Sequence, residues 1–277
     1  MNVTRFRDIA RFHELIEPVL MQREAENNFE LGLVKRLCGE PPHPEHFYAT
    51  VADEDGEIVV VSVMTPPWPL TVSRGPEGAL DALARFAHEQ QLPVNEVAGP
   101  VAAAQRCAAT LARLQGKSVQ TRRMMRIMQA RHVNPPPRPA SGALRIATMA
   151  DIKLIVEWMT AFGRDIGELH EIPRQRIEQR VTNSEHFLWE DAGIPVSTAA
   201  WAGPTPNGVR INAVYTPPPL RGRGYASNCV AQLTQQLLAG GKTFCFLYTD
   251  AANPTSNSIY QQIGYEVVCD WTNLALA

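Results

Sequence analysis

The chain has 277 residues, a formal net charge of −2, 45% hydrophobic residues and 19% charged residues. This composition is typical of a globular protein with one large or two modest domains. The near-neutral charge gives no electrostatic basis for a nucleic-acid or membrane partner, and no apolar run reaches the roughly 18 residues of a spanning helix. We therefore expect a cytoplasmic protein with neither kind of partner.

The five cysteines are scattered along the chain and form no CxxC pair. An odd, dispersed set argues against a disulfide framework and against a zinc site, and it favours a reducing compartment. No metal is therefore expected. Cys229 and Cys245 lie inside apolar patterns and are expected to be small core residues.

The clearest boundary is the segment NPPPRPAS at residues 134–141, which has four prolines. Such a segment is typical of a stiff, extended linker. It predicts an N-terminal domain at 1–133 and a C-terminal domain at 142–277.

The first half begins with helical patterns over residues 6–37, in which Phe29, Leu33 and Leu37 are expected to form one apolar face. A hairpin follows around the turn Asp53-Glu54-Asp55-Gly56. The other predicted elements alternate between helix and strand. The hairpin strands and these elements span residues 46–52, 58–64, 78–90, 94–98, 102–114 and 118–130.

The second half repeats this order. It predicts a short strand at 144–147, helices at 151–162 and 173–181, and a hairpin with strands at 186–190 and 195–202. A strand at 209–216, a helix at 226–240, a buried strand at 243–249, a helix at 253–264 and a final strand at 265–271 follow. The run TFCFLYT at 243–249 is apolar on both faces, which is typical of a buried strand parallel to its neighbour. The fold class is therefore α/β, with two units that each have a mixed sheet flanked by helices. No residue-level repeat supports a duplication.

The stretch 209–226, VRINAVYTPPPLRGRGYA, holds the most informative motif. A strand ends at three prolines, a turn with Gly222 and Gly224 follows, and a helix begins with its amides pointing back along the turn. Free amides and the helix dipole make such a turn an anion site, and glycines let a phosphate approach closely.

Two other phosphate motifs fit poorly. Gly222-x-Gly224-x-x-Ser227, with Asp250 as a ribose-binding acid, is similar to a dinucleotide fingerprint. That fold needs several further βα units, and only about 50 residues remain after the motif. A P-loop is excluded because the turn has no GK[ST], and the chain nowhere has the complete G-x-x-x-x-G-K-[ST] motif.

Arg221, Gly224 and Ala226 fit the pattern [RQ]-x-x-G-x-[GA], which resembles the pyrophosphate motif of the GNAT superfamily of acyl-CoA-dependent N-acyltransferases. A second motif agrees: Asn253, then Tyr260, then the pair Gly264-Tyr265. The resemblance covers residues 144–277. The first half has no such motif after its hairpin, so it is expected to be a degenerate GNAT-like copy that packs against the second half and shapes the acceptor pocket.

The resemblance implies a role for each motif residue. Backbone groups of Val214, Tyr215 and Thr216 would bind the pantetheine arm of acetyl-CoA, and the Asn253 side chain would assist. Tyr260 would protonate the departing thiolate. The pyrophosphate would be held by the amides of the turn, with charge-assisted contacts from its two arginines: Arg221, Gly222, Arg223, Gly224, Tyr225 and Ala226.

The general base stays open. Many relatives carry a glutamate on the central strand, where this chain has Asn212 and no acid. Glu168, His170 and Glu171 lie in a loop that borders the acceptor site in the family, and a water relay is an equal alternative.

The predicted function is transfer of an acetyl group from acetyl-CoA to a primary amine by direct attack in a ternary complex. One alternative is a non-catalytic acyl-CoA-binding or sensing module. Another is a tandem-domain transferase that uses aminoacyl-tRNA, which the missing basic charge and the CoA motif disfavour. The acceptor, the acyl-chain preference and the oligomeric state, a homodimer included, stay open.

Overall fold

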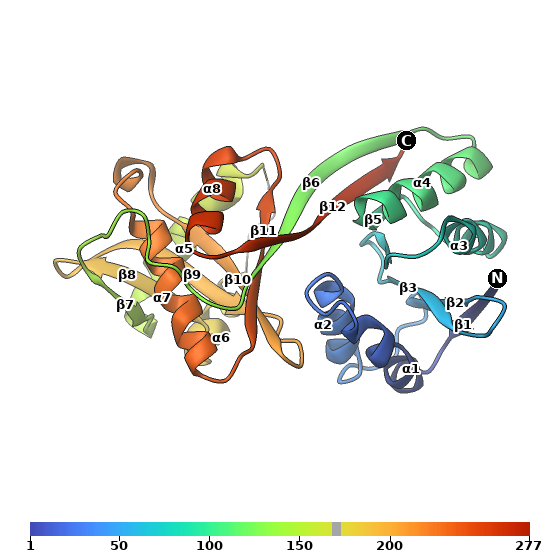
Figure 1. The fold of residues 1–277 in the computed structure, drawn as a ribbon, viewed down its shortest axis with the longest axis horizontal. Coiled ribbons are helices and arrows are strands. Elements are labelled where there is room, and N and C mark those ends of the chain that lie inside the picture. Colours follow the sequence, from blue (N-terminus) through green and yellow to red (C-terminus); the bar gives the residue numbers. More distant parts are fainter. Residues whose placement is uncertain (168–172) are drawn as a thin grey trace. The chain divides into compact units, whose positions relative to one another are not determined.

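A computed structural model describes residues 1–167 and 173–277. The chain forms two compact units (Figure 1). The first contains Met1–Ile127, Thr249–Asn253 and Val268–Ala277, and the second contains Met128–Tyr248 and Pro254–Val267. Within the described residues, every helix is too short or too polar to cross a lipid bilayer.

The first unit is a mixed sheet with the strand order β1-β2-β3-β4-β5-β12, and β6 follows β12. Its strands are β1 (Asn2–Phe6), β2 (Phe47–Ala52), β3 (Ile58–Met64), β4 (Leu70–Val72), β5 (Glu96–Pro100), β6 (Val119–Ala130) and β12 (Glu266–Leu276). Helices α1 (Ile9–Met21) and α2 (Asn28–Leu37) pack on one face, and α3 (Glu77–Glu89) and α4 (Val101–Gln115) pack on the other. The last strand of the chain thus pairs with β5 and completes this unit.

The second unit has the strand order β11-β10-β9-β8-β7. Its strands are β7 (Ala143–Ile146), β8 (His186–Asp191), β9 (Ile194–Ala202), β10 (Gly208–Tyr215) and β11 (Phe244–Asp250), and short 3₁₀ turns lie at Met149–Asp151 and Pro218–Leu220. Helices α5 (Ile152–Asp165) and α6 (Arg174–Thr182) cover one face. Helix α7 (Tyr225–Ala239) covers the opposite face, and α8 (Pro254–Gln262) follows β11 (Figure 1).

The α/β class with mixed sheets and flanking helices is confirmed, and both units share one order of elements. The predicted parallel strand is also correct, because β11 pairs in parallel with β10 and its residues from Phe244 to Leu247 are buried. Cys229 and Cys245 are fully buried, as expected for core residues. The division at residues 134–141 stays a prediction.

Two strands were missed, and one predicted helix face was partly wrong. Strand β1 ends at Phe6, where the helical pattern was expected to begin, and β4 is only three residues long, which is too short for measurable alternation. Of the predicted face of α2, Leu37 is buried and Leu33 packs partly buried on the same core. The rest of the buried face is Glu30, Leu31 and Val34, whereas Phe29 is 37% exposed and packs on Trp271. The burial of a glutamate in place of a phenylalanine reverses the usual preference, so a hydrophobicity pattern cannot find it.

Candidate functional site

Strands β10 and β11 pair in parallel only as far as Ile211 and Leu247. On its other side, the register of β10 with β9 shifts between Asn212 and Tyr215. Ala213, inside this irregularity, has a φ of 52°, in the left-handed region. Among the described residues, Ala213 and Val214 therefore have no ladder partner in β9 or β11. Backbone groups of β10 are left available at this point, in the middle of a sheet.

The three backbone positions predicted to bind pantetheine differ in their partners. Val214 packs against the core beneath α7 and lies within the irregular segment. The carbonyl oxygen of Tyr215 accepts a hydrogen bond from Ser197 Oγ at 3.1 Å. The carbonyl oxygen of Thr216 accepts one from Arg221 Nε at 2.9 Å. Val214 is thus the most available of the three.

The turn before α7 has the geometry that its glycines predict. Gly222 and Gly224 have φ values of 76° and 86°, and Gly224 is the N-cap of α7. Within the described part of the chain, the backbone amides from Gly222 to Ala226 have no protein acceptor. Unpaired amides at the start of a 15-residue helix, with its positive dipole end, form an anion site.

The two arginines of the turn have different surroundings. Arg221 is paired with Asp165 at the end of α5, with 2.5 Å between Nη2 and Oδ2, and its guanidinium lies 5.7 Å from the centre of the Tyr215 ring. It therefore joins the turn to the strand end and to α5. The charge of Arg223 acts on Asp191, whose carboxylate accepts a hydrogen bond from the Tyr225 hydroxyl at 2.7 Å. That hydrogen bond lowers the pKa of Asp191.

A third guanidinium reaches the turn from the proline-rich segment. Arg138 donates a hydrogen bond to the Gly222 carbonyl, and its own carbonyl accepts one from Asn228 Nδ2 at 2.7 Å. A Cβ atom on Gly224 would lie 2.7 Å from the Arg138 carbonyl oxygen, whereas one on Gly222 would meet nothing within 4 Å. Sequence reasoning treated this segment only as a linker, because no pattern in it signals that it packs on the turn.

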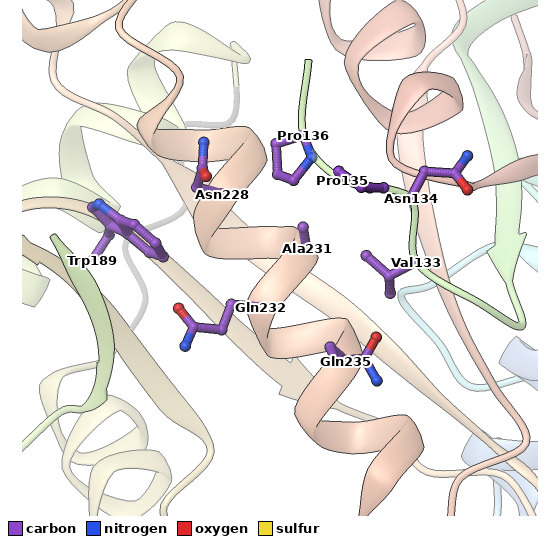
Figure 2. A pocket seen from close by; sticks show the side chains of 9 residues that line it. All are labelled: Val133, Asn134, Pro135, Pro136, Trp189, Asn228, Ala231, Gln232 and Gln235. Atoms are coloured by element: carbon purple, nitrogen blue, oxygen red, sulfur yellow. The ribbon is translucent and has the colours of Figure 1, made fainter. Parts of the chain in front are cut away.

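The same segment borders a cavity of about 320 Å³ on the outer side of α7 (Figure 2). Its lining consists of prolines, amides and a few apolar side chains: Val133, Asn134, Pro135, Pro136, Trp189, Asn228, Ala231, Gln232 and Gln235. No acid, base or nucleophile lines it, so it offers binding surface rather than reactive groups. Asn228 connects it to the turn through its hydrogen bond to the Arg138 carbonyl.

Tyr260 on α8 packs against the core that also contacts Val214, Leu220 and Tyr225. Its ring centre lies 5.9 Å from that of Tyr265. Burial raises the pKa of Tyr260 to about 12, so the phenol is protonated at neutral pH. Among the described residues, none forms a hydrogen bond with its hydroxyl. The structure thus brings a proton donor, the irregular part of β10 and the glycine turn to one core.

The remaining predicted residues are placed less directly. Asn253 is exposed just before α8, belongs to the first unit, and its backbone amide donates to the Asp250 carbonyl at 3.0 Å. Asn212 Oδ1 accepts a hydrogen bond from Arg180 Nη2 at 2.8 Å. Glu168, His170 and Glu171 lie outside the described residues.

The corresponding turn of the first unit, between β4 and α3, is built differently. Pro76 is the N-cap of α3 and Glu77 lies in its first turn. A proline removes one amide donor, and a carboxylate already occupies the positive end of the helix dipole. Both features disfavour anion binding, in agreement with the missing motif.

The fold defined by these units is that of the GNAT acetyltransferases, present twice in the chain. Residues 193–274 match the family model of the FR47-like protein. No curated protein matches the chain. In the residues that the structure describes, no group of three or more His, Cys, Asp or Glu side chains is placed to hold a metal ion.

Solved structures of similar fold cover the whole chain. A GCN5-related N-acetyltransferase from Sphaerobacter thermophilus is 18% identical, with a TM-score of 0.68 over 99% of this chain and 95% of that one. A Drosophila protein is 14% identical, with a TM-score of 0.67 over 99% and 98%. A GNAT-family acetyltransferase from Colwellia psychrerythraea is 13% identical, with a TM-score of 0.57 over 100% and 99%. These likenesses show the fold of the chain.

Proposed function

We propose that this protein is an N-acetyltransferase that moves an acetyl group from acetyl-CoA to a primary amine by direct attack in a ternary complex. The observation that carries the proposal is the glycine turn, whose amides have no acceptor among the described residues. The turn follows β10 closely, and the pairing of β10 with its two neighbours is interrupted near its end. A diphosphate fits the amides from Gly222 to Ala226, and an extended pantetheine arm fits the unpaired backbone near Val214.

The nucleotide end of acetyl-CoA would be held by the surroundings of the turn. Arg138 and Arg223 supply positive charge there, while Arg221 is already paired with Asp165. The cavity beside Asn228 lies in the size range of small ligand sites and offers amides and proline faces without charge. Asn253 would contact the pantetheine arm, as its motif implies.

Tyr260 would donate a hydrogen bond to the sulfur as the thioester breaks. A thiol has a pKa of about 8.5, whereas that of Tyr260 is about 12. Full proton transfer to the thiolate is therefore uphill in the resting site, and stabilisation of the developing charge is the larger contribution. The base that deprotonates the amine is a water molecule or a residue of the loop at 168–172, since Asn212 cannot accept the proton.

Isothermal titration with acetyl-CoA tests the donor site. Gly222→Glu places a carboxylate in the turn, where its Cβ atom meets nothing within 4 Å, so it should abolish binding. Gly241→Glu is the matched control, because Gly241 has a φ of 100°, open space around its Cβ position, and a place at the other end of α7. Binding that is absent in the wild type, or unchanged in Gly222→Glu, would contradict the proposal.

Turnover distinguishes an enzyme from a binding module. Release of free CoA thiol on adding amines to the acetyl-CoA complex is the expected result. Tight binding without thiol release for any amine would show a binding module instead.

A further inference from the structure

Three arginines gather on the face of the second unit that α5 and α6 cover. Arg210 on β10 and Arg180 on α6 are partly buried, and Arg176 lies exposed one helical turn before Arg180. The mutual repulsion of these charges lowers the pKa values of Arg180 and Arg210, after the larger effect of burial. Like charges in a partly buried place cost free energy unless something compensates them.

Among the described residues, Arg180 is the member of the cluster whose charge and hydrogen-bond donors are compensated. Its Nη2 donates to the Trp201 carbonyl at 3.0 Å and to Asn212 Oδ1 at 2.8 Å, and its Nε lies 3.8 Å from Glu185. Within the described residues, the carboxylate of Glu185 is therefore the one negative charge that offsets the three arginines. Arg180 acts as a positioning residue that fixes the Asn212 side chain.

Arg210 has no hydrogen-bond or ion-pair partner among the residues that the structure describes. Its Nε is buried and has no hydrogen-bond acceptor among the described residues, which also supply no ion pair to its guanidinium. The ionisable groups that act on it are Tyr248 on β11 and Arg176. A partly buried guanidinium with no anion beside it is costly and uncommon, because this group usually pairs with a carboxylate or phosphate.

The location of this charge relates it to the proposed reaction. Arg210 and Asn212 lie two residues apart on one strand and so share one face, at about 7 Å spacing. Asn212 is the first residue of β10 beyond its register with β11, where the proposed pantetheine path begins. A group bound by Arg210 therefore lies beside the point at which the thioester would arrive.

We propose that Arg210, with Arg176 at the rim, binds the carboxylate of the acceptor, so that the substrate is an amine of the amino-acid class. This inference rests on the proposed function, whose donor half has its own test above. A guanidinium suits a carboxylate because its parallel N–H groups can bind both oxygens.

The test compares acceptors of nearly equal size that differ in one charge. Acetyl transfer is measured for amino acids and for their amides, such as phenylalanine against phenylalaninamide and glycine against glycinamide. The acids should have a kcat/KM about tenfold to a hundredfold higher, which is the range that one charge-assisted hydrogen bond supplies. Equal or better use of the amides would overturn the inference.

Variants assign the effect to the arginines. Arg210→Gln should raise KM for the acids by the same factor and leave kcat, the amides and acetyl-CoA binding unchanged. Arg176→Gln, at an exposed position, should show a smaller change of the same kind and serves if Arg210→Gln folds poorly. The matched control is Arg174→Gln on the same helix, because Arg174 is exposed and paired with Glu178.

The outcomes separate the two proposals. If acetyl-CoA binds but Arg210→Gln keeps the preference for acids, or no amino acid in the panel is acetylated, this inference fails and the donor site stands. If acetyl-CoA does not bind the wild type, both fail. A purely structural Arg210 would instead lower the melting temperature on substitution, whereas removal of an unpaired charge should leave it unchanged or raise it.

Discussion

Glu30 on α2 should make the stability of the first unit depend on pH. It is fully buried, and within the described residues neither carboxyl oxygen has a hydrogen-bond partner. The hydroxyl of nearby Thr71 donates to the Val63 carbonyl at 3.0 Å, and Glu26 is bound to Arg74 through two hydrogen bonds. Burial raises the pKa of Glu30 from 4.5 to about 8, and the charge of Glu26 acts in the same direction.

The sign of the effect follows from these values. Below pH 4.5 Glu30 is protonated in both the folded and the unfolded chain, so its contribution is fully present. As the pH rises from 4.5 to about 8, the unfolded chain loses this proton while the folded chain keeps it. The free energy of unfolding should therefore fall by about 1.4 kcal/mol per pH unit in this window, which amounts to roughly 3 kcal/mol at pH 7.

The perturbation is Glu30→Gln, which has nearly the same shape and no proton to lose. Urea unfolding of the wild type and the variant is measured at pH 5, 6, 7 and 8, and the difference in unfolding free energy is plotted against pH. The variant should gain on the wild type steadily as the pH rises. Glu54→Gln, in an exposed turn, is the control for removal of one carboxylate. A difference that is constant from pH 5 to 8 would refute the reasoning.

Three further outcomes are expected at the donor site. Tyr260→Phe should lower kcat about a hundredfold with little change in acetyl-CoA affinity, as measured by thiol release and calorimetry, because only the proton donor is lost. Gly224→Ala should lower the melting temperature more than Gly222→Ala. Both substitutions cost about 1–2 kcal/mol because an alanine would have to adopt a left-handed backbone conformation. Only the Cβ atom at position 224 would also lie 2.7 Å from the Arg138 carbonyl oxygen. Arg138→Ala should weaken acetyl-CoA binding about tenfold but leave binding of acetyl-pantetheine, which lacks the diphosphate, unchanged; equal weakening of both would contradict its role.

The sequence predicted those parts of the fold that local patterns determine. The alternation of helix and strand, the buried parallel strand β11 and the left-handed glycines of the turn all follow from residues near one another in the chain. Strand β4 was missed because a three-residue strand between prolines exists only through its neighbours β3 and β5.

The site, too, could be predicted only where residues close together in the chain form a motif. Gly222 and Gly224 are visible in a motif, but Arg138 reaches the turn from 84 residues away. In the sequence, Arg210 has the pattern of an ordinary polar residue of a strand, and what distinguishes it is that the described residues supply no partner to its buried Nε. Such features depend on which segments meet in space, and a single sequence carries no record of that.

The alternation of side chains along β10 explains how one strand can serve both halves of the proposed reaction. Val209 and Ile211 point into the core beneath α7, which also contacts Tyr260, whereas Asn212 meets Arg180 of α6 on the other face. A donor that binds to β10 beyond its pairing with β11 uses backbone groups in the plane of the sheet and occupies neither face. In the proposed reaction, the leaving sulfur would meet Tyr260 on the α7 face, and the amine would approach from the α6 face with its carboxylate on Arg210. Because the two groups act on opposite sides of the thioester carbon, the acceptor site can change without disturbing the donor site.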